Sequence, residues 1–147
     1  MGTHRRAAQR LTAAIETYLA SQVEDTTSRT TTATGYGNLA TGGAFSTTVV
    51  VPASGWVRVD IRATQRNSAA NNTITSWRAV GSSTGTKYTE NDTAALIIAG
   101  TNNFPVGLSY LLTGLVPGET LTVTMLHRVN AGTGTVDYRQ IVLTGLP

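Results

Sequence analysis

Apolar and polar residues alternate along most of the chain beyond residue 30, most clearly in three runs between Phe104 and Leu146. In the first run, every second residue from Val106 to Leu112 is apolar or aromatic, and in the second the same holds from Leu121 to Met125. Successive side chains of a strand point to opposite faces of a sheet, so this period of two predicts half-buried antiparallel strands.

Turn residues separate the three runs. Val116-Pro117-Gly118-Glu119 predicts a type II turn, because Pro fixes φ at the second position and Gly accepts a positive φ at the third. Asn130 to Gly134 is expected to close a second hairpin. In the third run we expect Val136, Tyr138 and Val142 on one face, and Ile141 and Leu143 on the other.

The same alternation continues upstream. In Trp56–Thr64, the residues Val57, Val59, Ile61 and Ala63 are predicted to face inward, and Trp56, Arg58, Asp60, Arg62 and Thr64 outward. Further strands are predicted at Ala44–Val51, Thr73–Val80 and Ala94–Ala99, with a hairpin turn at Pro52–Gly55, a loop at Gly81–Thr86 and a first strand at Thr30–Thr34 that could instead be linker. About seven or eight strands at this spacing predict a mainly β protein, a single antiparallel β-sandwich of the jelly-roll type.

The N-terminal segment has a different period. Between Thr3 and Val23, apolar residues recur at helical spacing without an intervening Pro or Gly, which predicts an amphipathic α-helix. We therefore divide the chain into a helical docking or oligomerisation segment, residues 1–25, and a β-sandwich domain, residues 26–147. The helix either packs on its own sandwich or reaches a partner, and we favour the partner. The expected docking residues are Arg5, Arg6, Arg10, Leu11, Ile15, Tyr18 and Leu19.

Composition narrows the classes of function. The chain has 147 residues, 13% charged residues, a net charge of +3 and no cysteine, which excludes disulfides and thiolate metal sites. Its longest apolar runs are far shorter than a membrane span of about 20 residues. No membrane is therefore expected as a partner. Apart from Arg5, Arg6 and Arg10, arginine is dispersed rather than gathered into a patch, so a nucleic acid is not expected as a partner either.

No catalytic motif or cofactor fingerprint is apparent. His127 is interpreted as a packed or interface residue, and the sequence lacks the spacings of zinc ligands, a P-loop or a nucleophile elbow. Asp60 and Asp137 stand among arginines and are expected to form ion pairs, while Glu90 and Asp92 give only a weak Ca²⁺ signal. We expect a protein that is not an enzyme and has no cofactor or metal.

Two tryptophans stand out as candidates for contact. Trp56 and Trp77 are expected on outward faces or near turns, where aromatic rings can stack on sugars or enter protein interfaces. With Arg58 and Arg62 beside them, these residues predict an oligomer interface.

Several segments resemble a β-sandwich domain of tailed-phage virion proteins from phages of actinobacteria. The resemblance covers about 115 residues and is carried by TTTATGYGNLATGG, VPASGWVRVDIRA, NDTAALIIAGT, SYLLTGLVPGETLTV and GTGTVDYRQIVL. It implies a compact sandwich, usually trimeric, that is displayed on a virion as part of a minor tail, fibre, decoration or head-fibre protein. It supplies no catalytic residues.

The short basic segment before the sandwich favours a small protein that attaches to a lattice. We expect a trimeric capsid decoration or short head-fibre protein on the virion surface, which docks to the major capsid protein or a tail protein and stabilises the capsid. The alternative is a receptor-binding tip of a tail fibre, whose loops at Gln65–Asn72 and Gly81–Glu90 would contact a host-surface glycan.

Overall fold

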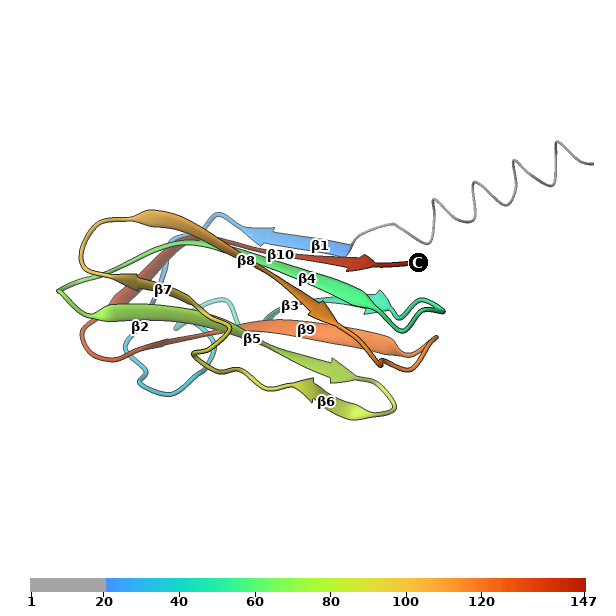
Figure 1. The fold of residues 1–147 in the computed structure, drawn as a ribbon. Helices are drawn as coiled ribbons and strands as arrows, with labels where there is room; N and C mark the ends of the chain where they lie inside the picture. Colours follow the sequence, from blue (N-terminus) through green and yellow to red (C-terminus); the bar gives the residue numbers. More distant parts are fainter. Residues whose placement is uncertain (1–20) are drawn as a thin grey trace, which may run out of the picture.

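The computed structural model describes residues 21–147, which form ten strands in two antiparallel sheets (Figure 1). The strands are β1 (Ser21–Asp25), β2 (Arg29–Thr31), β3 (Phe45–Val50), β4 (Val57–Asn67), β5 (Asn72–Gly81), β6 (Gly85–Tyr88), β7 (Leu96–Ala99), β8 (Phe104–Leu112), β9 (Thr120–Val129) and β10 (Gly134–Gly145). The sandwich is thereby confirmed, with more strands than the sequence predicts.

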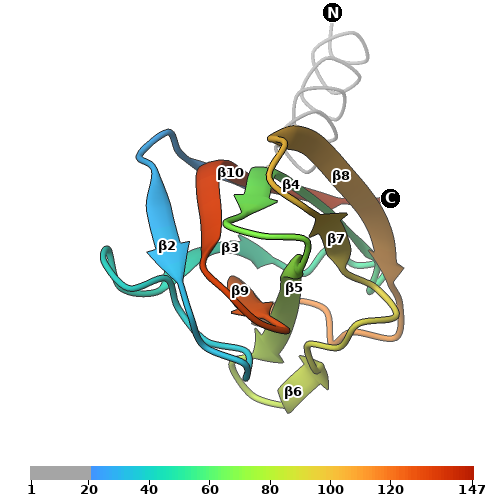
Figure 2. The same cartoon turned by 90° about the vertical axis from the view of Figure 1, so that its left-hand side faces the viewer.

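Sheet A has the order β1-β10-β4-β8, with β2 also paired to β10, and sheet B has the order β3-β9-β5-β6, with β7 paired to β5. Figure 2 shows the β10–β4–β8 layer and the β9–β5 layer facing each other. From β3 to β5, and again from β8 to β10, consecutive strands alternate between the two sheets. This alternation is the jelly-roll arrangement, in which the pairing strands lie far apart along the chain.

The alternation corrects two turn predictions. Residues 52–55 connect β3 in sheet B to β4 in sheet A, and residues 130–133 connect β9 in sheet B to β10 in sheet A, so neither closes a hairpin. Among the described strands, β5 and β6 are the consecutive strands that pair with each other. The expected type II turn is confirmed: Gly118 has a φ of 84°, and the Glu119 N–H donates to the Val116 carbonyl at 3.2 Å.

The predicted helix is wrong at its C-terminal end. Ser21, Gln22 and Val23 belong to β1, which pairs with β10 from Ser21↔Leu143 to Asp25↔Arg139. Pairing with β10 satisfies the backbone groups of this segment and packs Val23 against the core, which a local periodicity cannot reveal. Residues 1–20, with the docking residues predicted there, lie outside the described residues.

The core lies between the sheets and is built from the predicted inward positions. Val57, Val59, Ile61 and Ala63 of β4 are buried, as are the alternate residues of β9, Leu121, Val123 and Met125. The face assignment along β10 is confirmed for Tyr138, Val142, Ile141 and Leu143 and is wrong for Val136. The register shifts between Val136 and Tyr138, so that Val136 is buried with Ile141 and Leu143, while Tyr138 and Val142 point outward. A β-bulge at Asp137 inserts one residue and thus exchanges the faces beyond it.

The loop predicted at Gly81–Thr86 contains the start of β6. This strand has only four residues, too few for an alternating pattern to be recognised in the sequence. Within the described residues, no helix is long and apolar enough to cross a membrane.

Candidate functional site

The outer surface of sheet A is a candidate contact site, because it carries exposed charged and apolar side chains. We call it the sheet A face and define it by the outward side chains of β1, β10, β4 and β8. Alternation along β4 puts Arg58, Asp60 and Arg62 on this face, opposite the buried residues of the same strand. The register then adds Gln22, Glu24, Gln140, Val142, Pro105, Gly107, Ser109 and Leu111.

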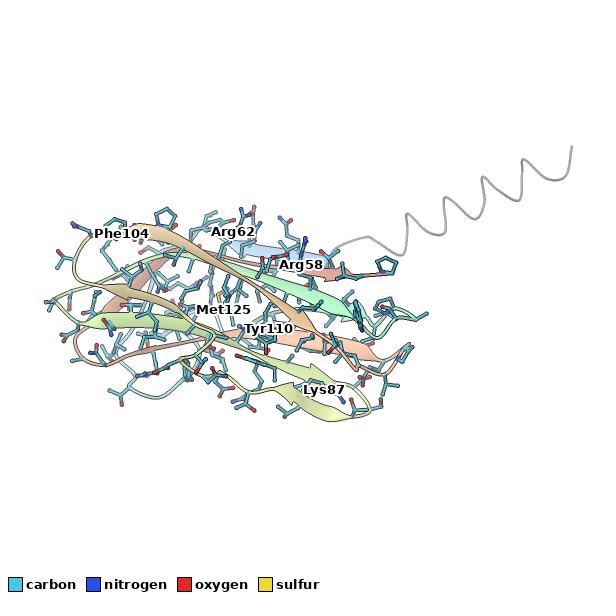
Figure 3. All side chains as sticks on the ribbon, in the orientation of Figure 1. Arg58, Arg62, Lys87, Phe104, Tyr110 and Met125 are labelled. Atoms are coloured by element: carbon cyan, nitrogen blue, oxygen red, sulfur yellow. The ribbon has the colours of Figure 1, made fainter. Side chains whose placement is uncertain are left out.

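Two of the three charged residues that define this face on β4, Arg58 and Asp60, are held in place. Arg58 Nε donates to Asp60 Oδ2 at 2.9 Å, and the Ser109 hydroxyl donates to the other oxygen of Asp60. Arg62 lies two residues after Asp60 on the same face of β4, and it has no ion-pair partner within residues 21–147. Figure 3 shows Arg58 and Arg62 on the same side of the molecule.

Arg62 lines three shallow hollows. One of about 440 Å³ is bordered by residues of β1, β4 and β10, and two of about 340 and 190 Å³ lie toward β8. Gly107 is the residue of β8 in register with Arg62, and the aliphatic part of the Arg62 side chain lies over it, because a Cβ at this position would be 3.4 Å from Arg62 Cγ. The lining residues are Gln22, Arg58, Asp60, Gln140 and Val142 for the first hollow; Ala63, Thr64, Pro105, Val106, Gly107 and Tyr138 for the second; and Asp60, Ile61, Gly107, Leu108 and Ser109 for the third.

The two tryptophans predicted at an interface differ in their exposure to solvent. Trp56 precedes β4 and is 46% exposed, so it is accessible beside the sheet A face. Trp77 is 0% exposed, so the prediction that it lies on an outer interface is wrong. On β5 it points inward with Thr73, Thr75 and Ala79, and its ring stacks on Tyr88 at 3.9 Å between centroids. The sequence contained one indication of this position: Trp77 is two residues from the apolar Ala79, so in a strand the two side chains lie on the same face.

The acidic residues considered for catalysis or Ca²⁺ are engaged by arginine. Asp137 accepts from Arg66 at 2.8 Å, and Asp60 from Arg58, as expected from the sequence. Glu90 accepts from Arg78 Nε at 2.7 Å. Within residues 21–147, no group of three or more histidine and carboxylate side chains is arranged to hold a metal ion.

Asp92 ties two loops to the outer side of sheet B. It accepts from the Tyr36 hydroxyl at 2.6 Å and forms an ion pair with Arg128 of β9. The hydrogen bond to Arg128 lowers the pKa of Asp92, while burial and the bond to Asp92 raise the pKa of Tyr36 to about 12. The role of Asp92 is therefore to hold loop residues against the sheet.

A chain of polar side chains crosses the interior between the sheets. The Gln65 amide donates to the carbonyls of Thr73 at 2.9 Å and Leu96 at 3.0 Å, and the Thr75 hydroxyl donates to Gln65 Oε1 at 2.6 Å. That hydroxyl has one proton, so at 2.8 Å it must accept from Nδ1–H of His127. His127 Nε2 then carries the lone pair that faces Nη1 of Arg139 at 3.5 Å.

His127 is accordingly a neutral, packed residue, as the sequence suggested. Burial, followed by the charge of Arg139, lowers the pKa of its imidazole to about 3. A neutral ring with both nitrogens facing protein partners serves the core, and it offers no open lone pair to a metal or substrate.

Arg139 connects this interior to the edge of the sandwich. Its Nη2 and Nε donate to Asp25 Oδ2 at 2.9 and 3.2 Å, and its guanidinium lies 4.2 Å from the centre of the Phe45 ring. Arg29 also donates to Asp25, at 2.6 Å, and the two guanidinium groups hold the pKa of this carboxyl far below its usual range, Arg29 most strongly. No local sequence pattern predicts this network, because its members come from distant positions.

Comparison with known proteins adds information on the fold. No protein-family model matches the chain, and no curated protein is similar in sequence. Among solved structures, a chain from the T13 IBDV viral particle has a TM-score of 0.52 at 8% identity, over 85% of this chain and 30% of that one. The present chain thus spans under a third of the viral chain.

Two other similar structures come from different settings. Eiger TNF from S. frugiperda has a TM-score of 0.48 at 12% identity, over 88% of this chain and 93% of its own. The enzymatically active domain of tailspike protein 4 of bacteriophage CBA120 has a TM-score of 0.40 at 11% identity, over 90% of this chain and 20% of its own. At these identities the viral-particle match shows a shared β-sandwich fold and nothing specific to phages of actinobacteria.

Proposed function

We propose that this chain is a non-enzymatic protein of a phage virion surface, a trimeric capsid decoration or short head-fibre protein. The observation that carries the proposal is the division of its polar groups. Asp60, Glu90, Asp92 and Asp137 are each engaged by an arginine, and His127 is neutral and buried, whereas the sheet A face stays exposed. Such a division suits a protein that assembles rather than one that reacts.

The basic N-terminal segment is the proposed attachment to the virion. Arg5, Arg6 and Arg10 would meet an acidic surface of the major capsid protein, and bound copies would stabilise the lattice by mass action, because disassembly must first release them. The jelly-roll fold, shared with a viral-particle chain, is compatible with this role.

The proposal is tested by copy number. In purified virions, the protein should be present at a copy number comparable to that of the major capsid protein and should lie on the head. A few copies at the tail would support the alternative receptor-binding tip, which a glycan array would then examine. Absence from the particle would reject both.

Attachment is tested separately with the full chain. Reversing Arg5, Arg6 and Arg10 to Glu should abolish binding to undecorated capsids while leaving the melting temperature of the sandwich unchanged. A truncation should end at residue 20, because β1 begins at Ser21 and belongs to sheet A. Full capsid occupancy by the reversed variant would exclude this segment as the attachment.

A further inference from the structure

Most charged side chains of the described residues are already paired. Six ion pairs join them, and Glu119, which is buried, accepts hydrogen bonds from Thr84 and Ser83. Within residues 21–147, the charged side chains that remain without an ion pair and outside the core are Glu24, Arg62 and Lys87. These three side chains are therefore the charged groups in this part of the chain that remain available to pair with another molecule, and their positions indicate where such a contact could form.

Two of the three lie in one row across the sheet A face. The register pairs Glu24 of β1 with Gln140 of β10, Gln140 with Arg62 of β4, and Arg62 with Gly107 of β8. At about 5 Å between neighbouring strands, the backbones of Glu24 and Arg62 are roughly 10 Å apart, with Gln140 between them, and the two side chains form no ion pair with each other. Lys87 lies on β6, on the opposite side of the molecule (Figure 3).

The two ends of this row have complementary shapes as well as charges. Glu24 is exposed on the edge strand β1, where it can project toward a neighbour. Arg62 is exposed, and its side chain extends over Gly107 and borders hollows of about 340 and 190 Å³. The row therefore presents a negative edge at one end and an open positive recess at the other.

We propose that a second copy of the chain occupies this recess: Glu24 of one copy enters the hollow over Gly107 and pairs with Arg62 of its neighbour. The ring of three that such a head-to-tail contact would form rests on the proposed function, because a heterologous contact closes into a ring when its rotation allows. The contact itself does not depend on the virion.

Apolar residues around the row can supply the binding affinity that a single ion pair does not. An exposed ion pair contributes less than about 1 kcal/mol, so it sets orientation and partner choice more than affinity. Apolar surface lies close by at Leu111, which is 46% exposed, and at Trp56, Pro105 and Val142. Stable interfaces bury roughly 800 Å² per partner, so the contact must include these apolar residues as well as the row.

The experiment exchanges the two charges in the full chain. Association is measured by sedimentation equilibrium for the unchanged protein, Glu24→Arg, Arg62→Glu and the double variant. Each single change should weaken association by at least about tenfold, because two like charges then meet, and the double variant should recover to within about threefold. Lys87→Glu is the matched control, with the same change of charge on the other side, and should associate normally.

Each outcome decides for or against the contact. Recovery in the double variant supports it, with folding of the single variants checked by thermal melts. A monomeric unchanged protein, single changes without effect, or a double variant as weak as the singles would overturn it. Copy number on virions is measured independently, so a rescued oligomer that is absent from particles would reject the proposed function and keep the contact.

Discussion

Arg139 and Arg62 occupy neighbouring strands of the same sheet and differ in almost every respect. Arg139 is in register with Ala63, one residue from Arg62, yet the two side chains leave sheet A on opposite sides. Arg139 is buried and contacts Asp25, His127 and Phe45, whereas Arg62 is exposed and unpaired within the described residues.

The difference separates stability from assembly. A buried guanidinium must be hydrogen-bonded and paired, because its desolvation is costly, so Arg139 belongs to the fold. An exposed, unpaired guanidinium costs the fold little and remains available to another surface. Substitutions in the interior should therefore lower the stability of the fold, whereas substitutions on the sheet A face should weaken association. Four predictions test this difference.

The largest effect is expected at Trp77. Replacing it by Ala removes a fully buried ring stacked on Tyr88 and should lower the free energy of unfolding by about 3–5 kcal/mol. Trp56→Ala, at an exposed site, should change it by less than about 1 kcal/mol and instead weaken association. Chemical denaturation measures both, and a similar cost for the two would contradict the assignment of Trp77 to the core.

The next effect concerns the two arginines. Arg139→Met removes the hydrogen bonds of Arg139 to Asp25 and its contact with His127, while Asp25 keeps Arg29 and His127 keeps Thr75, and it should cost about 2 kcal/mol of folding free energy. Arg62→Met, the matched change on the outer side of the same sheet, should cost less than about 0.5 kcal/mol. If the order were reversed, the interior network would not be a determinant of stability.

Acid should act through His127. Its pKa in the folded protein, about 3, is below the ordinary value of about 6.5, so the unfolded chain binds more protons and stability falls as the pH drops below about 6.5. At pH 5 the loss attributable to this group should be about 2 kcal/mol. Asp25, with its lowered pKa, adds its own loss only at lower pH.

The measurement is the free energy of unfolding between pH 7 and pH 5, compared with His127→Gln. The variant is less stable throughout but should lose less on acidification, because the titrating group is gone. Parallel curves for the two proteins would show that His127 does not contribute in this range.

The smallest effect on stability, and the sharpest on assembly, is expected at Gly107. An added Cβ would meet Arg62 Cγ at 3.4 Å, a contact that a flexible side chain relieves, so Gly107→Val should change the free energy of unfolding by less than about 0.5 kcal/mol. It fills the hollow beside Arg62, however, and should reduce association. Unchanged association would place the contact elsewhere.

The sequence predicted the parts of the fold that depend on local pattern. The alternation of β4 placed Val57 inward and Arg58 and Arg62 outward, and the Pro117-Gly118 turn is of the expected type. It failed where distant partners decide. Ser21–Val23 continue a helical period but pair with β10, more than a hundred residues away, and a bulge at Asp137 exchanges the faces of β10.

The candidate site was predicted in part for the same reason. Arg58, Arg62 and Trp56 could be placed on the outside because apolar and polar residues alternate strictly in and around β4. Trp77 was misplaced because both faces of β5 carry polar residues, so the alternation does not distinguish them. Glu24 was not singled out at all. Its place in a row with Arg62 depends on the register of three strands from both ends of the chain.

Chemical labelling at the middle of the sheet A face measures whether this face is covered in the assembled protein. The chain has no cysteine, so Gln140→Cys, at the centre of the row, and Thr86→Cys, exposed on β6, each introduce one thiol. In the assembled protein, a maleimide should modify the β6 site readily and the Gln140 site slowly, and dilution to monomers should accelerate labelling at Gln140, which is half-buried in one copy, while leaving the β6 rate unchanged. Equal labelling in the assembled protein would contradict the assignment of this face to assembly.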